Sequence, residues 1–181
     1  MGRYVLSDAA PLICLSMVGG LQWLAAIFGR VHLTEAVRGE ILAGLNKPGE
    51  DALAAAIKRR ILRVHPGWKW PEPRYPDLGR GEESCICAAI NLARRGHNCL
   101  LVIDDREGRR MAASLSIPIT GTAAIIGAAR KRGLIASAAT VFADLRHKGF
   151  RISEAIVQAV LESIGEHAIP SARTKPLPPR R

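Results

Sequence analysis

Five acidic residues stand at positions where a carboxylate is energetically costly. Asp8 follows the short apolar run at residues 4–7, and the pair Asp104 and Asp105 follows the apolar run at residues 100–103. Glu40 and Glu82 interrupt the apolar stripes of two predicted helices. A buried carboxylate needs a positive partner, and clustered carboxylates suit Mg²⁺ or Mn²⁺. The five residues therefore predict a divalent metal site.

Each acid also has an ordinary structural explanation. Asp8 and Asp105 are suited to capping the helices that follow them, and Glu40 could bend to solvent or pair with an arginine. Glu82 lies in the first turn of the helix predicted at residues 80–95, where the helix dipole favours an acid. Helical geometry puts Glu82 near the middle of the buried face of that helix and Glu83 towards its edge. The set indicates a metal site more strongly than any one member does.

The charge balance favours a polyanionic partner. The chain has 181 residues, 26 Lys and Arg against 16 Asp and Glu, and a net charge of +10. If the five acids converge, the remaining surface is strongly basic, and such a field attracts nucleic acid. An anionic membrane is the competing partner, but no predicted helix has a long, purely basic face. A metal ion beside a phosphodiester can generate a hydroxide nucleophile, so the sequence predicts a metal-dependent nuclease.

Short apolar strands alternate with helices along the chain. This order predicts a mainly parallel sheet wrapped by helices, with its functional site beyond the carboxyl ends of the strands. The predicted strands are residues 4–7, 31–33, 61–64, 100–103 and 117–119. The predicted helices are residues 12–17, 21–28, 34–43, 50–60, 80–95, 106–115, 122–132, 138–148 and 153–164.

The length and hydrophobic content predict one domain at residues 1–167, followed by a flexible, basic, proline-rich tail at residues 168–181. Residues 65–79 break the pattern and carry Trp68, Trp70 and Tyr75. These rings could stack on bases, but anchoring the proline-rich segment or contacting a partner is the favoured interpretation.

One uncharged stretch, residues 9–29, is long enough to be tested as a membrane span. Its central Gly19-Gly20 pair and the polar Ser16 and Gln22 favour two short buried helices instead. The four cysteines lie in apolar stretches with no metal-ligand spacing, as expected of reduced thiols. We therefore expect a soluble cytoplasmic protein that does not enter a membrane.

Several motifs, in order along residues 4–165, resemble those of PIN-domain nucleases, most closely the small prokaryotic branch related to VapC-type toxins. The similar stretches are Ser7-Asp8-Ala9-Ala10-Pro11-Leu12-Ile13, Leu33-Thr34-Glu35-Ala36-Val37 up to Glu40, Gly79-Arg80-Gly81-Glu82, Leu101-Val102-Ile103-Asp104-Asp105 with Gly108-Arg109-Arg110, Ile119-Thr120-Gly121-Thr122, and Lys148-Gly149-Phe150-Arg151-Ile152-Ser153.

The resemblance implies a three-layer α/β/α sandwich and Mg²⁺- or Mn²⁺-dependent cleavage of RNA. It implies that the first three acids of the catalytic site are Asp8, Glu40 and Glu82. The Asp104–Asp105 pair supplies the fourth, with either residue facing the metal, so the expected metal ligands are Asp8, Glu82, Asp104 and Asp105. It further implies a small antitoxin protein as partner and a homodimer.

The arginines that follow the last acids closely are candidates for phosphate contacts, although a solvated helix face would have the same composition. They are Arg106, Arg109 and Arg110.

Two departures from the family pattern leave an alternative open. Ala9-Ala10 and Ile103 stand where hydroxyl residues are common in these toxins, and such hydroxyls orient metal ligands. A catalytically weak or inactive PIN-like module that binds nucleic acid or protein is therefore the second hypothesis. A receiver-like phosphoryl-transfer protein is the third, but Ile119 is followed by Thr120, Gly121 and Thr122 rather than by the expected lysine.

Overall fold

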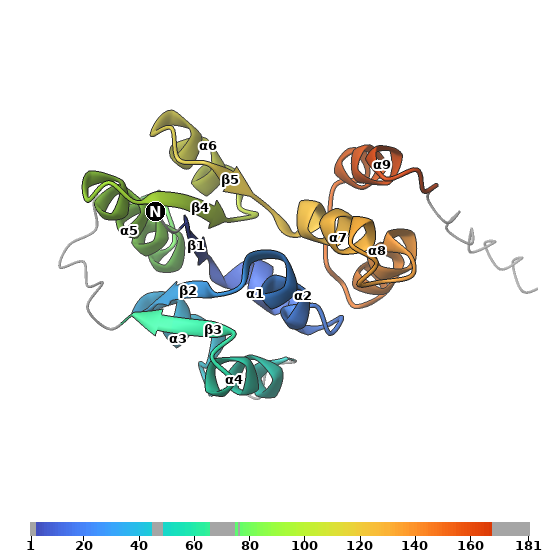
Figure 1. The fold of residues 1–181 in the computed structure, drawn as a ribbon, viewed down its shortest axis with the longest axis horizontal. Helices are drawn as coiled ribbons and strands as arrows, with labels where there is room; N and C mark the ends of the chain where they lie inside the picture. Colours follow the sequence, from blue (N-terminus) through green and yellow to red (C-terminus); the bar gives the residue numbers. More distant parts are fainter. Residues whose placement is uncertain (1–2, 45–48, 66–74, 76, 168–181) are drawn as a thin grey trace, which may run out of the picture.

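The computed structural model of the chain describes residues 3–44, 49–65, 75 and 77–167. Within these residues, five strands form one sheet in the order β3-β2-β1-β4-β5, and every neighbouring pair is parallel (Figure 1). The carboxyl ends of the strands therefore lie along one edge of the sheet and the amino ends along the opposite edge. The strands are β1 (Arg3–Ser7), β2 (Val31–Thr34), β3 (Leu62–His65), β4 (Asn98–Val102) and β5 (Ile119–Thr120).

Helices lie on both sides of this sheet, which confirms the predicted α/β sandwich. α1, α2 and α4 contact one another. In addition, α2 contacts β2 and α4 contacts β3. α5 and α6 contact one another. α5 packs on β4, and α6 packs on β5. The described helices are α1 (Ala9–Ser16), α2 (Leu21–Phe28), α3 (Glu35–Ile41), α4 (Glu50–Lys58), α5 (Arg80–Arg94), α6 (Arg106–Ser114), α7 (Thr122–Lys131), α8 (Ala138–His147) and α9 (Glu154–Ser163).

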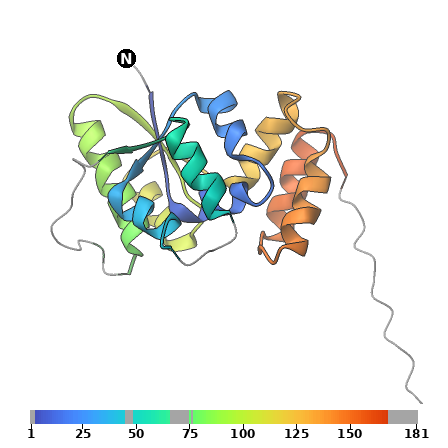
Figure 2. The ribbon, with the colours of Figure 1, turned by 90° about the horizontal axis from the view of Figure 1, so that it is seen from below.

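The last three helices form a block beside the sheet, joined to it through contacts of α7 with α1 and α2 (Figure 2). Glu166 ties this block together. Its carboxylate accepts hydrogen bonds from Arg130 Nε at 2.5 Å, from Ser137 Oγ at 3.1 Å and from the Ala139 N–H at 3.0 Å. The segment that follows α9 is thus fixed to α7 and α8.

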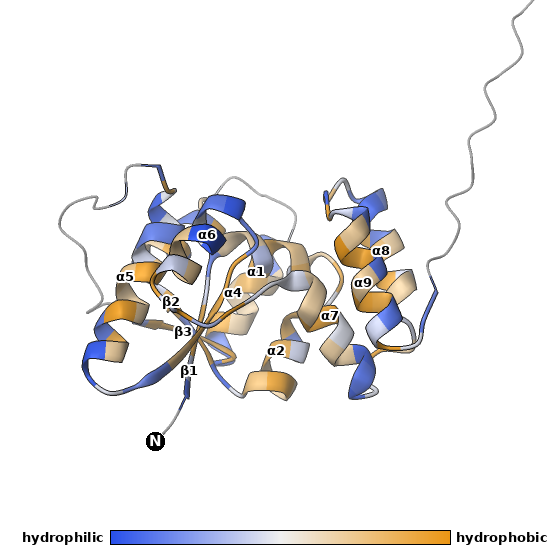
Figure 3. Ribbon diagram, turned by 90° about the horizontal axis from the view of Figure 1, so that it is seen from above, coloured by the Kyte–Doolittle hydropathy of each residue, from blue (hydrophilic) through white to orange (hydrophobic). Residues whose placement is uncertain are grey.

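The core explains why the short apolar runs become strands. Leu6, Leu33 and Leu101 have no exposed surface, and they lie in the middle of β1, β2 and β4. Parallel strands covered on both faces read as continuous apolar runs. The colouring in Figure 3 follows the same logic, since α2, which lies between the sheet and α7, is mainly hydrophobic, whereas α6 is mainly hydrophilic.

The strand leading to the acidic pair is displaced from its predicted position. β4 begins at Asn98 because that residue pairs with Arg3, the first residue of β1. The strand ends at Val102, although Ile103 stays fully buried and its N–H donates to the Thr120 carbonyl at 2.9 Å. Asp104 therefore lies two residues beyond the strand rather than directly after it.

Helix ends follow the expected capping chemistry with small shifts. The Thr34 hydroxyl accepts a hydrogen bond from the Val37 N–H at 3.2 Å, as predicted for the start of α3. α3 is shorter than predicted and ends at Ile41. Gly96 follows α5 with a φ of 77°, the left-handed conformation that favours glycine at this position.

Much of the proline-rich segment lies outside the described residues, including Trp68 and Trp70, and so does the tail at residues 168–181. Tyr75 is half-buried and packs against the core, in line with the anchoring that the sequence favours.

The uncharged stretch forms the bent pair of α1 and α2. In the described part of the chain no single helix is long and apolar enough to cross a membrane. The two helices are long and apolar enough only when taken together, and the chain bends by 116° between them.

Candidate active site

Asp8 lies at the carboxyl end of β1 and is almost completely buried, with 2% of its surface exposed. Its N–H donates to the Val102 carbonyl at 3.0 Å, so its backbone is held between β1 and β4. Its side chain caps α1 through a long contact of 3.5 Å from the Ala10 N–H. The capping role foreseen for Asp8 is therefore real but weak, and it does not account for burying a carboxylate.

The charges that act most strongly on Asp8 are negative. The pKa of Asp8 is raised to about 6, chiefly by burial and also by the nearby carboxylates of Glu82 and Glu40, which act against hydrogen bonds from the Ala9 and Ala10 backbone. A carboxylate in this environment is stabilised by a cation.

Glu40 meets Asp8 at the start of α5. The Gly81 N–H donates to Glu40 Oε1 at 2.8 Å. A Cβ atom at residue 81 would lie 2.6 Å from Glu40 Oε2 and 2.9 Å from Asp8 Oδ1. Residue 81 is therefore a glycine at the point where carboxylates from β1 and α3 converge. The sequence marks this position only as one of two glycines before Glu82.

Glu82 faces the same group of acids from the first turn of α5. Its Oε2 accepts a hydrogen bond from the Gly79 N–H at 2.6 Å. Burial raises the pKa of Glu82, and the carboxylates of Asp105 and Glu40 add to this effect against the Gly79 hydrogen bond. Glu82 thus links Glu40 on one side to Asp105 on the other.

The predicted burial order of the two glutamates in this turn is wrong. Glu83 is the buried one, with 8% of its surface exposed, whereas Glu82 is half-buried. The reason is tertiary: the Tyr75 N–H donates to Glu83 Oε1 at 3.0 Å, so the segment before α5 covers that side of the helix.

The two neighbouring aspartates point to different partners. Asp105 caps α6, accepting from the Gly108 N–H at 2.8 Å, and its charge acts on Glu82. Asp104 instead accepts hydrogen bonds from the N–H and hydroxyl of Thr122 at the start of α7, at 2.8 and 2.5 Å. Of the pair that the sequence left open, Asp105 is the member beside Glu82.

The buried hydroxyl groups of Thr34 and Ser84 form a hydrogen-bonded chain that ends at Gly81. Thr34 Oγ1 and Ser84 Oγ are 2.6 Å apart, and Ser84 Oγ donates to the Gly81 carbonyl at 2.7 Å. Because the single Ser84 proton goes to Gly81, the Thr34 hydroxyl donates to Ser84. This chain fixes the start of α5 against α3. In the sequence, Thr34 stands at the start of the helix predicted at residues 34–43, and Ser84 carries no signal of its own.

The three candidate phosphate-binding arginines differ in their surroundings. Arg109 is half-buried, and one of its guanidinium nitrogens donates to the Ile103 carbonyl at 2.9 Å. It also lines a hollow of about 640 Å³ together with Asp104, Thr122 and Phe150. Arg110 is exposed and pairs with Glu107 at 2.5 Å, and Arg106 is exposed. Only Arg109 is therefore placed beside an acid of the candidate site.

The donor set suits a hard divalent cation, because all the converging side chains are carboxylates. Among the described residues, no group of three or more His, Cys, Asp or Glu side chains is arranged so that it could hold a metal ion by itself. Mg²⁺ needs no such group, since it keeps several waters and takes one or two carboxylates together with substrate phosphates. The buried Asp8 with its acidic neighbours fits that pattern.

Comparison with known families decides the assignment. A family model described as a PIN domain (DUF3368) matches residues 4–166, which include all five acids. The chain belongs to the PIN-domain family. The PIN domain is a nuclease-type fold, so the resemblance seen in the sequence motifs is confirmed at the level of the family. No curated protein sequence is similar enough to count as a match.

Proposed function

We propose that this PIN domain is a Mg²⁺- or Mn²⁺-dependent endoribonuclease of the kind that serves as the toxin of a toxin–antitoxin pair. The observation that carries the proposal is the buried Asp8 carboxylate with Glu40 and Glu82 as its nearest charges. Such a group is unfavourable by itself and suited to a hard cation.

In this proposal the carboxylates divide into two roles. Asp8, Glu82 and Asp105 would hold the ion, together with its waters, whereas Asp104 accepts hydrogen bonds from Thr122 at the start of α7. When bound, a divalent ion supplies a nucleophilic water at neutral pH and offsets negative charge on the scissile phosphate. Glu40 is the proton acceptor, because the Gly81 N–H fixes one of its oxygens beside Asp8.

The substrate assignment to RNA rests on charge and on the family resemblance. The chain carries a net charge of +10, and five of its 16 acids belong to the candidate site, so the remaining surface attracts a phosphate backbone. Arg109, beside Asp104 in the hollow next to α7, is the first candidate for holding that backbone. Arg106 and Arg110 lie on the same helix, α6, with their side chains exposed to solvent.

The proposed partners are a small antitoxin protein and a second copy of the chain, with the protein acting in the cytoplasm. Support comes from the resemblance to VapC-type toxins and from four free, buried cysteines, which suit a reducing compartment. Co-expression with the product of the adjacent gene, followed by co-purification and measurement of cleavage, tests the antitoxin.

RNA cleavage by the purified full-length protein tests the enzyme. We expect cleavage with Mn²⁺, loss of cleavage in EDTA, and loss in the double variant Asp8→Asn/Glu82→Gln. Glu35→Gln is a matched control, because Glu35 lies on α3 like Glu40 but pairs with Arg38 at the surface. Cleavage that persists in EDTA or in the double variant would contradict the proposal.

A binding module without catalysis is the second candidate. One observation favours it: Asp104 is committed to Thr122, while the fully buried Ile103 stands where a ligand-orienting hydroxyl is common in these toxins. Tight RNA binding without cleavage at millimolar Mn²⁺ would support this candidate over the nuclease.

A further inference from the structure

A group of basic side chains gathers at the edge of the sheet opposite the carboxylates. Arg3 is the first residue of β1, Arg30 precedes β2, Arg63 is the second residue of β3, and His97 precedes β4. Because the strands are parallel, these residues share the amino-terminal edge. Arg3 lies five residues before Asp8, roughly 15 Å along the strand. Arg63 pairs with His32, which pairs with Leu6, so Arg63 lies closer to the level of Asp8 but two strands away in the sheet. The basic edge is therefore distinct from the candidate active site.

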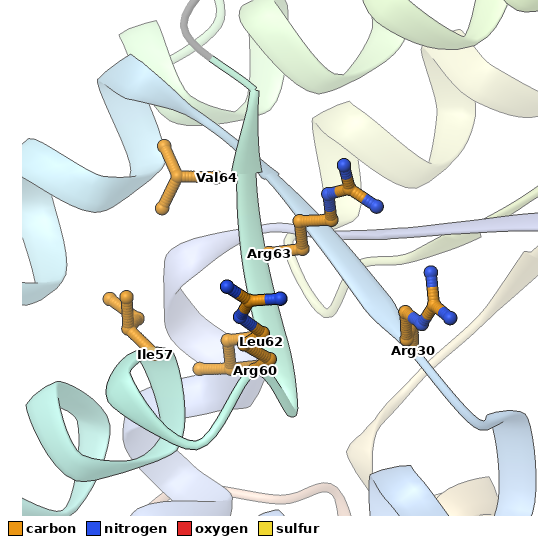
Figure 4. A pocket seen from close by; sticks show the side chains of 6 residues that line it. All are labelled: Arg30, Ile57, Arg60, Leu62, Arg63 and Val64. Atoms are coloured by element: carbon orange, nitrogen blue, oxygen red, sulfur yellow. The ribbon is translucent and has the colours of Figure 1, made fainter.

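The basic edge is hollowed in two adjoining places. One hollow, of about 390 Å³, is lined by the arginines Arg3, Arg30 and Arg63 together with Tyr4 and three histidines. The other, of about 530 Å³, shares Arg30 and Arg63 and adds Arg60 (Figure 4). Figure 4 shows Arg63 and Arg30 on one side of β3 and the apolar Ile57 and Val64 on the other, with Arg60 and Leu62 near the strand. Arg30 and Arg63 thus serve both hollows.

A row of rings forms one side of the first hollow. His32 Nδ1 and His65 Nε2 are 2.6 Å apart, so the N–H of one imidazole donates to the unprotonated nitrogen of the other. The Tyr4 ring lies between His32 and His97, with centroid distances of 5.0 and 5.2 Å. The sequence shows only scattered histidines, and it is the parallel pairing of β2 with β3 that brings His32 and His65 together.

The basic edge carries unbalanced positive charge. Among the residues that the structure describes, no Asp or Glu lines either hollow. Within the described residues, no carboxylate pairs with Arg3, Arg30, Arg60 or Arg63. The pKa of His32 is lowered to about 4, chiefly by burial and also by the charges of His65, Arg63 and Arg30. Such a cluster is self-repelling, and an anion would relieve the repulsion.

We propose that this basic edge is a second ligand site, which binds a phosphate group between the guanidinium groups of Arg30 and Arg63. Planar guanidinium groups bind phosphate in a bidentate manner. The neighbouring histidines add N–H donors, and the hollow has room for more than one phosphate-sized group. A metal ion is disfavoured despite the histidines, because the surrounding arginines repel a cation.

Inorganic phosphate is the first probe, measured by calorimetry on the full-length protein in EDTA, so that the carboxylate site does not contribute. Arg30→Gln/Arg63→Gln is expected to weaken phosphate binding at least about tenfold. Arg30→Lys/Arg63→Lys keeps the charge but loses the planar fork, and an intermediate loss is expected. The matched control Lys131→Gln/Arg146→Gln removes the same charge from α7 and α8 and is expected to change binding less than about twofold.

A short single-stranded RNA with either a 5′-phosphate or a 5′-hydroxyl separates the two sources of the phosphate. If Arg30→Gln/Arg63→Gln abolishes a preference for the phosphorylated end, the ligand is the end of a nucleic acid. If only the affinity for inorganic phosphate falls, the ligand is a small phosphate compound. Equal phosphate affinity in Arg30→Gln/Arg63→Gln and in the control overturns the proposal. So does Zn²⁺ binding that His32→Ala abolishes in a protein that binds no phosphate. None of these readouts depends on RNA cleavage.

Discussion

Asp8 is the residue whose charge the fold tolerates least. Its pKa is raised from 3.8 to about 6, chiefly by burial, so the folded protein favours the protonated form. The contribution of Asp8 to the stability of the folded protein is therefore fully present below the pKa that Asp8 has in the unfolded chain. It is lost as the pH rises through about 6. At neutral pH the metal-free protein therefore carries a cost on the order of 3 kcal/mol at this residue.

Replacing Asp8 with Asn should accordingly stabilise the metal-free protein. Asn keeps the shape and the weak helix cap while removing the buried charge. In EDTA at pH 7.5 we expect the free energy of unfolding, measured with urea, to rise by about 1–3 kcal/mol. At pH 4.5 the gain should largely disappear.

The exposed Asp51 provides a control at the start of α4. Asp51→Asn should change stability by less than about 0.5 kcal/mol at either pH. An Asp8→Asn variant that is destabilised equally at both pH values would mean that the carboxylate is stabilised in the fold.

Replacing Gly81 with Ala adds a single methyl group, which should lower the activity much more than the stability. In Gly81→Ala the new Cβ would lie under 3 Å from oxygens of both Glu40 and Asp8. Glu40 can move aside, but the buried Asp8 cannot, so the carboxylates are forced apart. We expect RNA cleavage to fall at least about tenfold, whereas the free energy of unfolding changes by no more than about 1 kcal/mol.

Gly39→Ala is the matched control for that substitution. Gly39 lies within α3, and a Cβ there would meet nothing within 4 Å. This variant should keep full activity and gain up to about 1 kcal/mol in stability from the higher helix propensity of alanine. Equal activity in the two variants would show that the carboxylates do not need their present separation.

At the scale of elements, local signals in the sequence were sufficient for the strands and helices. Apolar runs and Thr34 predicted β1, β2 and the start of α3 with small shifts at the ends. Local signals could not show that the segment at Tyr75 covers Glu83, or that Thr122 turns Asp104 towards α7. Both effects come from residues distant in the sequence, so periodicity within one helix or strand carries no trace of them.

The hydroxyl chain between α3 and α5 gives a prediction at this scale. Thr34→Val removes the helix cap and leaves the buried Ser84 hydroxyl without its donor. We expect the free energy of unfolding to drop by about 1–3 kcal/mol and RNA cleavage to fall as well, because α5 carries Glu82.

Thr34→Ser keeps the hydroxyl and should retain most of the stability and activity. If Thr34→Ser is as damaging as Thr34→Val, packing of the Thr34 methyl group rather than the hydrogen bonds fixes the two helices.

The molecule as a whole places the carboxylates of its candidate active site and a cluster of exposed arginines towards opposite ends of the strands of one sheet. The acids follow β1 and β4, whereas Arg3, Arg30 and Arg63 stand near the starts of β1, β2 and β3. Metal binding at the acidic edge is therefore expected to stabilise the folded chain without help from the basic edge.

Addition of Mn²⁺ should raise the thermal midpoint of the wild-type protein. Saturation to about 100 times the dissociation constant corresponds to about 2.7 kcal/mol. Asp8→Asn/Glu82→Gln should lose this response, whereas Arg30→Gln/Arg63→Gln should keep it, as followed by differential scanning fluorimetry. A response that survives in the first variant would place the ion elsewhere.

The shortness of β1 has an electrostatic consequence for the two edges. Five residues of strand set Arg3 and Asp8 roughly 15 Å apart, which exceeds the Debye length of about 8 Å at physiological ionic strength but is well below the 30 Å found at 0.01 M salt. In physiological buffer an approaching anion meets each edge as an independent charge. At low salt it meets one molecular dipole, which orients the chain before contact.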